Sequence, residues 1–185
     1  MDQVKLSNPA PLGLMGFGFT TVLLNLANAG LFPVNGAILA MGVFYGGLAQ
    51  VIAGIAEFKT GNTFGMTAFT SYGFFWLTLV TIIITPKLGW IDPPSAAFMG
   101  WYLLGWGIFT FMMWVAIVGK AGKGLQFIFL TLWILFLLLA LHAWSGIDAI
   151  GKIAGWEGLI CGLSAVYVAM GTVINGQRAK TVLPL

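Results

Sequence analysis

Charged residues are scarce in this sequence. Of its 185 residues, 59% are hydrophobic and 7% are Asp, Glu, Lys or Arg. A soluble domain normally carries about a quarter charged residues, which cover its surface. The eight basic and five acidic residues found here are too few to cover a soluble fold of this length. The composition therefore excludes an ordinary soluble domain and indicates a membrane protein.

Cysteine and histidine are scarcer still. Cys161 and His142 are the single examples of their kind, so the sequence offers no internal disulfide and no cluster of metal ligands. No nucleophile stands beside a base in a recognisable motif. The net charge of +3, without a dense basic run, also argues against nucleic acid as a partner. We therefore expect no metal, no cofactor and no enzymatic activity.

Long apolar segments are what the sequence has in place of charge. A helix that crosses the bilayer needs about 20 mostly apolar residues, and it satisfies its own backbone groups, for which lipid offers no partner. A membrane barrel would need segments that alternate in hydrophobicity, and these do not. The sequence predicts one all-α domain over 1–185, with six transmembrane helices at about 12–29, 37–58, 64–84, 96–118, 125–144 and 156–174.

The basic residues predict an orientation, because cytoplasmic loops carry an excess of Lys and Arg. Six of the eight basic residues fall on the side that holds both termini, and Lys87 and Lys152 fall on the other. This distribution predicts a multi-pass protein of the cytoplasmic (inner) membrane with both termini in the cytoplasm. The six residues are Lys5, Lys59, Lys120, Lys123, Arg178 and Lys180.

The start of the first helix is the most informative stretch and reads NPAPLGLMGFG over residues 8–18. Asn8 is a good N-cap, and Pro9 suits the first helical position because its missing N–H would be unpaired there anyway. Gly13 and Gly16 let another helix or a ligand approach the backbone closely. The free N–H groups of a helix start favour an anion, although a capped helix with a glycine packing face explains the same residues.

Two polar stripes are candidates for the lining of a path. Hydroxyl and amide groups inside lipid must find partners or line a wet cavity, and hydrogen bonds between helices are the alternative. One stripe, in the first helix, holds Thr20, Thr21, Asn25 and Asn28, and the other, in the third helix, holds Thr63, Thr67, Thr70 and Ser71. With the start of the chain, the candidate path residues are Asn8, Pro9, Gly13, Gly16, Thr20, Thr21, Asn25, Thr67, Thr70 and Ser71.

Two acidic residues and two glycine pairs have structural interpretations that need no transport path. Glu57 ends the second helix and is interpreted as an interfacial residue, and Glu157 is interpreted as an acid that opens the last helix, where the helix dipole favours it. The segments 42–46 and 158–162 each begin and end with glycine. Such spacings let helices pack closely in lipid, and the sequence leaves open whether they do so within one subunit or between subunits.

Residues 8–17 resemble the signature of the acetate uptake transporter family, whose members are also called succinate–acetate permeases. That signature reads Asn-Pro-Ala/Val-Pro-Leu/Phe-Gly-Leu, then a variable residue, a small residue and Phe, and every position is satisfied here. Further similarity lies in FYGG at 44–47, GNTFG at 61–65, TAFTSYG at 67–73 and TVLP at 181–184. The resemblance therefore extends over nearly the whole chain.

The resemblance implies six transmembrane helices, a hexamer, and a separate path through each protomer. It also implies a hydrophobic constriction of one Phe, one Tyr and one Leu. Phe17 and Tyr72 match the first two, and Leu132 is the best match for the third, with Leu130 as the alternative. Such a ring opposes a hydrated anion and can gate by dewetting. The implied substrates are acetate and, in some members, succinate, and the mode, proton symport or anion channel, is left open.

Two other functions fit parts of the sequence. The tripeptide NPA at 8–10 matches that of aquaporins, which are neutral-solute channels, but aquaporins use two copies deep in the membrane and this sequence has one, before its first helix. A membrane scaffold or sensor that uses its glycine faces only for assembly is the second alternative. It predicts no flux of solute.

Overall fold

The structure, a computed structural model, describes residues 6–178 and 180–185, and Lys5 of the orientation argument lies outside them. The described residues form helices and short connections with no strand among them. Six helical stretches are long and apolar enough to cross a membrane, which confirms the predicted all-α architecture. The elements are α1 (Ala10–Asn28), α2 (Gly36–Met41), η1 (Gly42–Ala49), α3 (Gln50–Thr60), α4 (Thr63–Lys87), α5 (Ala96–Ile117), α6 (Lys123–Ser145) and α7 (Asp148–Arg178).

The second span is a composite, because its middle part, η1, is a π-helix between α2 and α3. Three glycines of η1, Gly42, Gly46 and Gly47, are buried. A Cβ at Gly46 would lie 2.9 Å from both Thr20 Cγ2 and Trp76 Cγ, so this wide turn admits side chains from α1 and α4. Short π-helical insertions are rare and occur often at functional sites.

The helix ends follow the turn chemistry of the sequence, with one shift. Gly61 ends α3 with φ +76° in open space, and Asn62 then caps α4 by accepting the N–H of Gly65 at 3.0 Å. At the start of α1 the cap position is Pro9, one residue later than predicted, and Asn8 Oδ1 accepts the N–H of Ala10 at 3.0 Å. Asn8 therefore orders the turn into the helix, since Pro9 has no side-chain acceptor.

The last span differs most from its predicted range, because α7 begins at Asp148 and not near residue 156. Gly146 ends α6 in the left-handed conformation, with φ +66°, and only Ile147 separates it from α7. Asp148 and Lys152 lower the local hydropathy, so the apolar run starts later than the helix does. As a result Glu157 lies well inside α7 and does not open it, which corrects its interpretation as a helix-opening acid.

Glycine faces join α1 to α7 within the subunit. A Cβ at Gly18 would lie 2.7 Å from the carbonyl oxygen of Gly162, and a Cβ at Gly162 would lie 2.8 Å from that of Gly18. Gly155 faces the backbone of Ala29, and Gly158 faces the amide of Asn25. Backbones this close exclude larger side chains. The 158–162 spacing is therefore an internal contact, which answers one question that the sequence left open.

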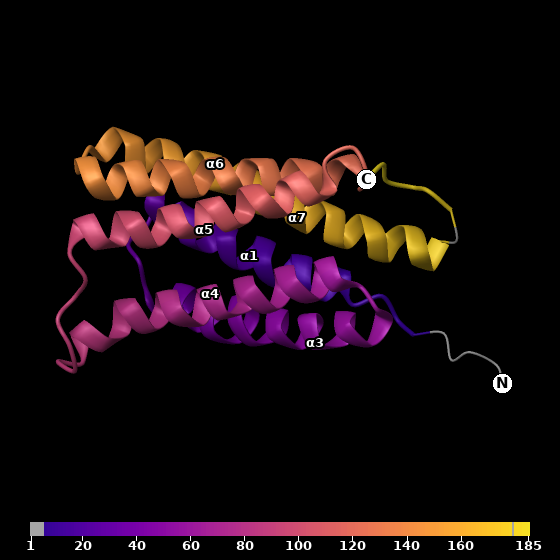
Figure 1. Cartoon of the computed structure of the whole chain (residues 1–185), viewed down its shortest axis with the longest axis horizontal. Helices are drawn as coiled ribbons and strands as arrows, with labels where there is room; N and C mark the ends of the chain where they lie inside the picture. The colour runs from indigo at the N-terminus through magenta and orange to yellow at the C-terminus, as the bar shows by residue number, and fades with distance from the viewer. Residues whose placement is uncertain (1–5, 179) are drawn as a thin grey trace.

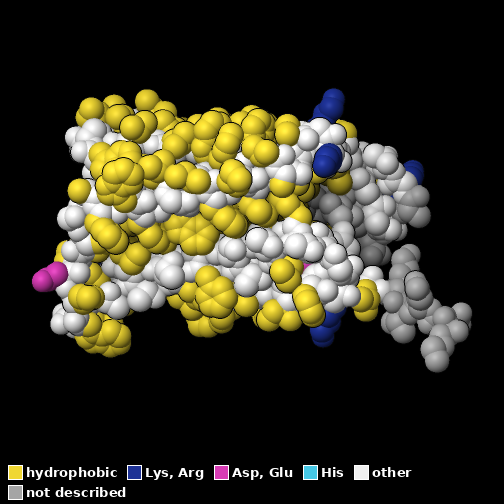
Figure 2. Space-filling model, viewed as in Figure 1, with side chains coloured by type: hydrophobic (Ala, Val, Ile, Leu, Met, Phe, Trp, Pro, Cys, Tyr) yellow, Lys and Arg dark blue, Asp and Glu magenta, His cyan; other side chains and the backbone are white. Residues whose placement is uncertain are grey.

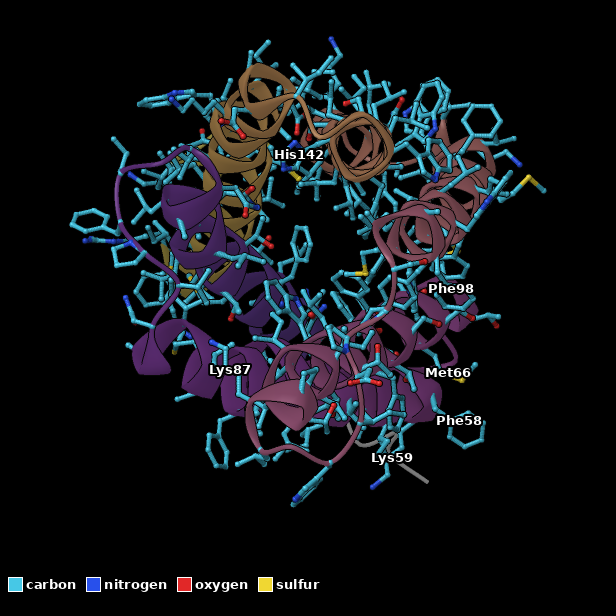
Figure 3. All side chains as sticks on the ribbon, turned by 90° about the vertical axis from the view of Figure 1, so that its left-hand side faces the viewer. Phe58, Lys59, Met66, Lys87, Phe98 and His142 are labelled. Carbon is cyan, nitrogen blue, oxygen red and sulfur yellow. The ribbon has the colours of Figure 1, made fainter. Side chains whose placement is uncertain are left out.

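The six spans form a ring when viewed along their axis (Figure 3). Labelled side chains such as Phe58 and Phe98 point away from the ring, into the surrounding space. The start of α1 and the C-terminus lie at the same end, which we call the near end, and the α4–α5 connection lies at the far end (Figure 1). Apolar side chains cover the flank between the two ends (Figure 2), as a lipid environment requires.

Candidate functional site

Two cavities lie inside the ring of helices, and each has a volume of about 210 Å³. A water molecule occupies about 30 Å³ of the liquid, so each cavity has room for several waters or one small solute. The near cavity opens among the first turns of α1, α4 and α6 and the ends of α3 and α7, and includes Leu14, Gln50, Glu57, Ile128 and Thr172. The far cavity lies between α1, α4, α5 and α6 and includes Thr21, Asn25, Trp76, Leu103 and Phe136.

Three residues line both cavities: Phe17, Tyr72 and Leu132. They come from α1, α4 and α6 and are nearly fully buried, with exposed fractions of 6%, 3% and 3%. The ring centroids of Phe17 and Tyr72 lie 6.1 Å apart. We call these three residues the neck, because they are shared by the linings of the near cavity and the far cavity.

The position of Tyr72 in the neck is fixed by α5. Its hydroxyl lies 2.9 Å from Oγ1 of Thr110, and Thr110 in turn donates to the carbonyl of Trp106 at 2.7 Å. The rings of Phe109 and Phe129 lie 5.5 and 6.1 Å from the ring of Tyr72. Polar and aromatic contacts therefore hold the phenol ring of Tyr72 in place. The sequence segment 67–73, which contains Tyr72, does not indicate Thr110 as its partner.

The first polar stripe lies only partly along the far cavity. Thr21, Asn25 and Asn28 line it. Asn25 Nδ2 donates to the carbonyl of Thr21 at 2.9 Å, and Asn25 Oδ1 accepts from Asn28 Nδ2 at 3.0 Å. Thr20 is fully buried beside Gly46 of η1, and its hydroxyl donates to the carbonyl of Met41, the last residue of α2, at 3.4 Å. Thr20 therefore makes a hydrogen bond between two helices and does not line a path, which was the alternative interpretation of this stripe.

The glycines of the signature face other parts of the protein. A Cβ at Gly13 would meet the ring of Phe69, and a Cβ at Gly16 would meet the carbonyl oxygen of Tyr45. Neither glycine, nor Asn8 or Pro9, is among the described residues that line the two cavities. The close approach that these glycines permit is that of α4 and η1 to α1.

The second polar stripe faces away from both cavities. Thr67, Thr70 and Ser71 are not among the described residues lining them. Thr70 packs on Gly54 of α3, and Ser71 borders a shallow hollow on the outer surface with Trp101. Because successive helix residues are rotated by about 100°, the face of α4 that holds Tyr72 carries apolar neighbours. Those neighbours are Ala68, Phe69, Phe75 and Trp76.

Two buried polar residues of the near cavity were not predicted to line a path: Gln50 and Glu57. Their exposed fractions are 1% and 2%. Glu57 Oε2 accepts from Asn62 Nδ2 at 2.9 Å and from Thr60 Oγ1 at 3.2 Å. Oε1 of Glu57 and Oε1 of Gln50 have no hydrogen-bond partner among the described residues. Glu57 is therefore a buried cavity residue and not an interfacial one.

A signal for this pair existed in the sequence. Gln50 and Glu57 are seven residues apart, which places them on one face of a helix, and polar residues inside an apolar span are functional candidates by default. Among the described residues that line either cavity, Glu57 carries the single carboxylate, and none that lines the far cavity is charged. The two cavities therefore differ in polarity on either side of the neck.

Comparison with known proteins identifies the family to which the chain belongs. The model of the GPR1/FUN34/yaaH family matches residues 1–185. The succinate-acetate/proton symporter SatP of Escherichia coli strain K12 is 59% identical over 185 residues, which cover 100% of this chain and 98% of that protein. Acetate permease A of Emericella nidulans is 34% identical over 204 residues, covering 100% of this chain and 67% of the relative.

A solved structure agrees with the fold as well. The structure of the bacterial acetate channel SatP matches with a TM-score of 0.96 and 60% sequence identity, covering 98% of this chain and 99% of that chain. The family resemblance predicted from the first helix is thereby confirmed, in sequence and in fold. The chain belongs to the GPR1/FUN34/yaaH family.

Proposed function

We propose that this protein carries acetate, and other small carboxylates such as succinate, across the cytoplasmic membrane through a path inside each protomer. The observation that carries the proposal is that Phe17, Tyr72 and Leu132 line both cavities. A solute that passes from one cavity to the other must cross this apolar neck. The relatives named for succinate and acetate support the choice of solute.

The neck acts as a barrier that selects small solutes. An apolar ring opposes a hydrated ion, since the ion must lose water without gaining new partners. A small carboxylate has one charged end and one apolar end, so its methyl group can pack on the rings of the neck. Cavities of about 210 Å³ on either side hold the solute before and after this step.

We propose that the near end faces the cytoplasm. Of the described basic residues, five lie at the near end and two, Lys87 and Lys152, at the far end, a bias typical of cytoplasmic loops. The test is labelling from outside intact cells of single cysteines introduced at Lys180 or at Asp92. Labelling at Asp92 alone is expected, and labelling at Lys180 alone would reverse the orientation.

We propose that the protein assembles as a homo-hexamer with a separate path in each protomer. The family resemblance supports this number, and the apolar flank of the ring provides surface for both lipid and neighbouring protomers (Figure 2). Native mass spectrometry from detergent measures the number of subunits. A monomer with full transport activity would contradict the hexamer and leave the path inside the protomer standing.

The deciding experiment is the flux of labelled acetate into proteoliposomes, with and without an imposed pH gradient. We expect saturable flux that Phe17→Trp blocks, because the larger indole fills the neck. Uptake that follows the pH gradient, after correction for acetic acid diffusion, favours proton symport, and uptake that follows voltage favours an anion channel. An assembled protein without acetate flux would overturn the proposal, and osmotic swelling with neutral solutes would favour the aquaporin-like alternative.

A further inference from the structure

Residues 181–185 fold back on the near end of the protein (Figure 1), and we call them the strap. Asn175, in the last turn of α7, binds the backbone of the strap. Its Oδ1 accepts the N–H of Val182 at 2.7 Å and the N–H of Leu183 at 2.9 Å, and its Nδ2 donates to the carbonyl of Leu183 at 2.8 Å. One side chain therefore holds two successive peptide groups through main-chain hydrogen bonds, as peptide-binding proteins do.

The strap continues along one face of α7. Tyr167, Gly171 and Asn175 are spaced four residues apart, so they lie on the same side of the helix. The hydroxyl of Tyr167 donates to the carbonyl of Pro184 at 2.9 Å. A Cβ at Gly171 would meet the side chain of Leu185. The glycine thus leaves the space in which Leu185 packs on α7.

The end of the strap lies behind a wall of the near cavity. The carbonyl carbon of Leu185 is 3.6 Å from the position of a Cβ at Gly124, in the first turn of α6, and Cγ2 of Val168 on α7 is 2.6 Å from that position. Val168 lines the near cavity, as do Leu125 of α6 and Thr172 of α7. The strap therefore lies against the place where α6 and α7 meet beside the near cavity.

The attachment of the strap is suited to release. At 1.5 Å per residue, the 31 residues of α7 extend about 46 Å, which exceeds the hydrocarbon thickness of about 30 Å. The end of α7 that holds the strap also carries the exposed side chains of Gln177 and Arg178. Within the strap Leu183 is half-buried and the other four residues are exposed. A segment with so few buried apolar contacts opens more readily than the helices on which it rests.

We propose that the strap is a latch at the mouth of the near cavity. Docked, it holds the first turn of α6 against α7 and narrows the mouth. Undocked, it lets these two helix ends separate, so that a solute passes between the near cavity and the water beyond. The proposal deepens the proposed function, on which it rests. The neck selects the solute, whereas the strap controls how far the wall between α6 and α7 opens.

The first test locks the latch. Gly122→Cys with Leu185→Cys places one thiol on either side of the contact, because the carbonyl oxygen of Leu185 lies 3.9 Å from the position of a Cβ at Gly122. A short bismaleimide with a reducible linker joins the two thiols, and the buried Cys161 is left in place. We expect the joined protein in proteoliposomes to carry acetate at least about fivefold more slowly and reduction of the linker to restore the rate.

The matched controls for the lock are the two single-cysteine variants, treated with the same reagent. They should keep their rates. Acetate flux that is unchanged in the joined protein would overturn the latch and show that the strap is a fixed brace.

The second test releases the latch. Asn175→Leu with Tyr167→Phe removes the four hydrogen bonds described above, and Gln177→Leu with Tyr45→Phe is the matched control on α7 and η1. A spin label on a cysteine at Val182 reports docking through its mobility. We expect the test variant to free the label and to carry acetate at least as fast as the unmodified protein, and the control to change neither.

Two results of the second test would overturn the latch. One is a label that stays immobile in the test variant, and the other is loss of acetate flux in a test variant that assembles normally by size-exclusion chromatography. Absence of flux in the unmodified protein would instead remove the proposed function, and the label would still report whether the strap docks.

Discussion

The hydroxyl of Tyr72 on α4 lies 2.9 Å from Oγ1 of Thr110 on α5, and both groups are buried. This bond ties the neck to the neighbouring helix α5. Thr110 also bonds to the carbonyl of Trp106 within its own helix, so the hydroxyl has both a donor and an acceptor role. The neck therefore depends on a residue that does not line either cavity.

Thr110→Val should destabilise the protein, because it leaves the Tyr72 hydroxyl buried without its partner. We expect the free energy of unfolding to fall by about 1–3 kcal/mol. Thermal unfolding in detergent measures the effect. The double variant Tyr72→Phe with Thr110→Val removes both groups and should lose less than the sum of the two single variants; strict additivity would contradict a coupled pair.

Phe17→Ala should widen the neck and relax its selection by size. The ratio of butyrate flux to acetate flux should rise, since the lost ring leaves room for a longer chain. The matched control is Phe19→Ala, which truncates an exposed phenylalanine of the same helix and should leave the ratio unchanged. Equal ratios in the two variants would show that Phe17 does not set the size limit.

Leu132→Ala should change acetate flux and Leu130→Ala should not. Leu132 lines both cavities, whereas Leu130 is half-buried and is not among the described lining residues. Both substitutions remove the same atoms from α6, so each controls for the other. Initial rates of acetate uptake decide the matter, and a larger effect at Leu130 would move the constriction to that position.

Glu57→Gln should reduce the response of acetate uptake to an imposed pH gradient. Glu57 is the one carboxyl group among the described residues lining the two cavities, so it is the acid placed to exchange a proton with a passing solute. Glutamine keeps an acceptor for Asn62 and Thr60, and the fold should therefore persist. An unchanged response, with normal assembly, would exclude Glu57 from proton coupling.

Glu157→Gln should stabilise the protein. Both carboxyl oxygens of Glu157 are buried within α7 without a partner among the described residues, and a buried ionisable group without partners is costly in an apolar surrounding. We expect a gain of about 1 kcal/mol in the free energy of unfolding. The control is Asp92→Asn in the exposed α4–α5 connection, which should change little, and a loss of stability in Glu157→Gln would reveal a partner for this carboxylate.

Hydropathy predicted the number of spans because lipid imposes one simple requirement on every helix. The same measure missed the first two turns of α7, where Asp148 and Lys152 interrupt the apolar run although the helix continues. It could not reveal the π-helix η1 either, because hydropathy does not distinguish a π-helix from an α-helix of the same composition.

The path was harder to predict than the spans, because we expected polar residues to face it. In α4 the opposite holds: Thr70 packs on α3, and the cavity wall is made by Tyr72 and apolar neighbours. Phe17, Tyr72 and Leu132 entered the prediction through the family resemblance, and no periodicity marks them. Gln50 and Glu57 carried a signal in their spacing, but Glu57 was interpreted as an end-of-helix residue.

The seam between α4 and α5 has a consequence for how this protein can change. These two helices meet through side chains, among them Tyr72 with Thr110, Thr78 with Tyr102, and the stacked rings of Phe75 and Tyr102. On that side the far cavity is lined by aromatic side chains of α4, among them Phe75, and by aliphatic side chains of α5, Met99 and Leu103. Because the two helices meet here through side chains, exchange of one of these side chains for a smaller one would widen the passage on this side of the protein.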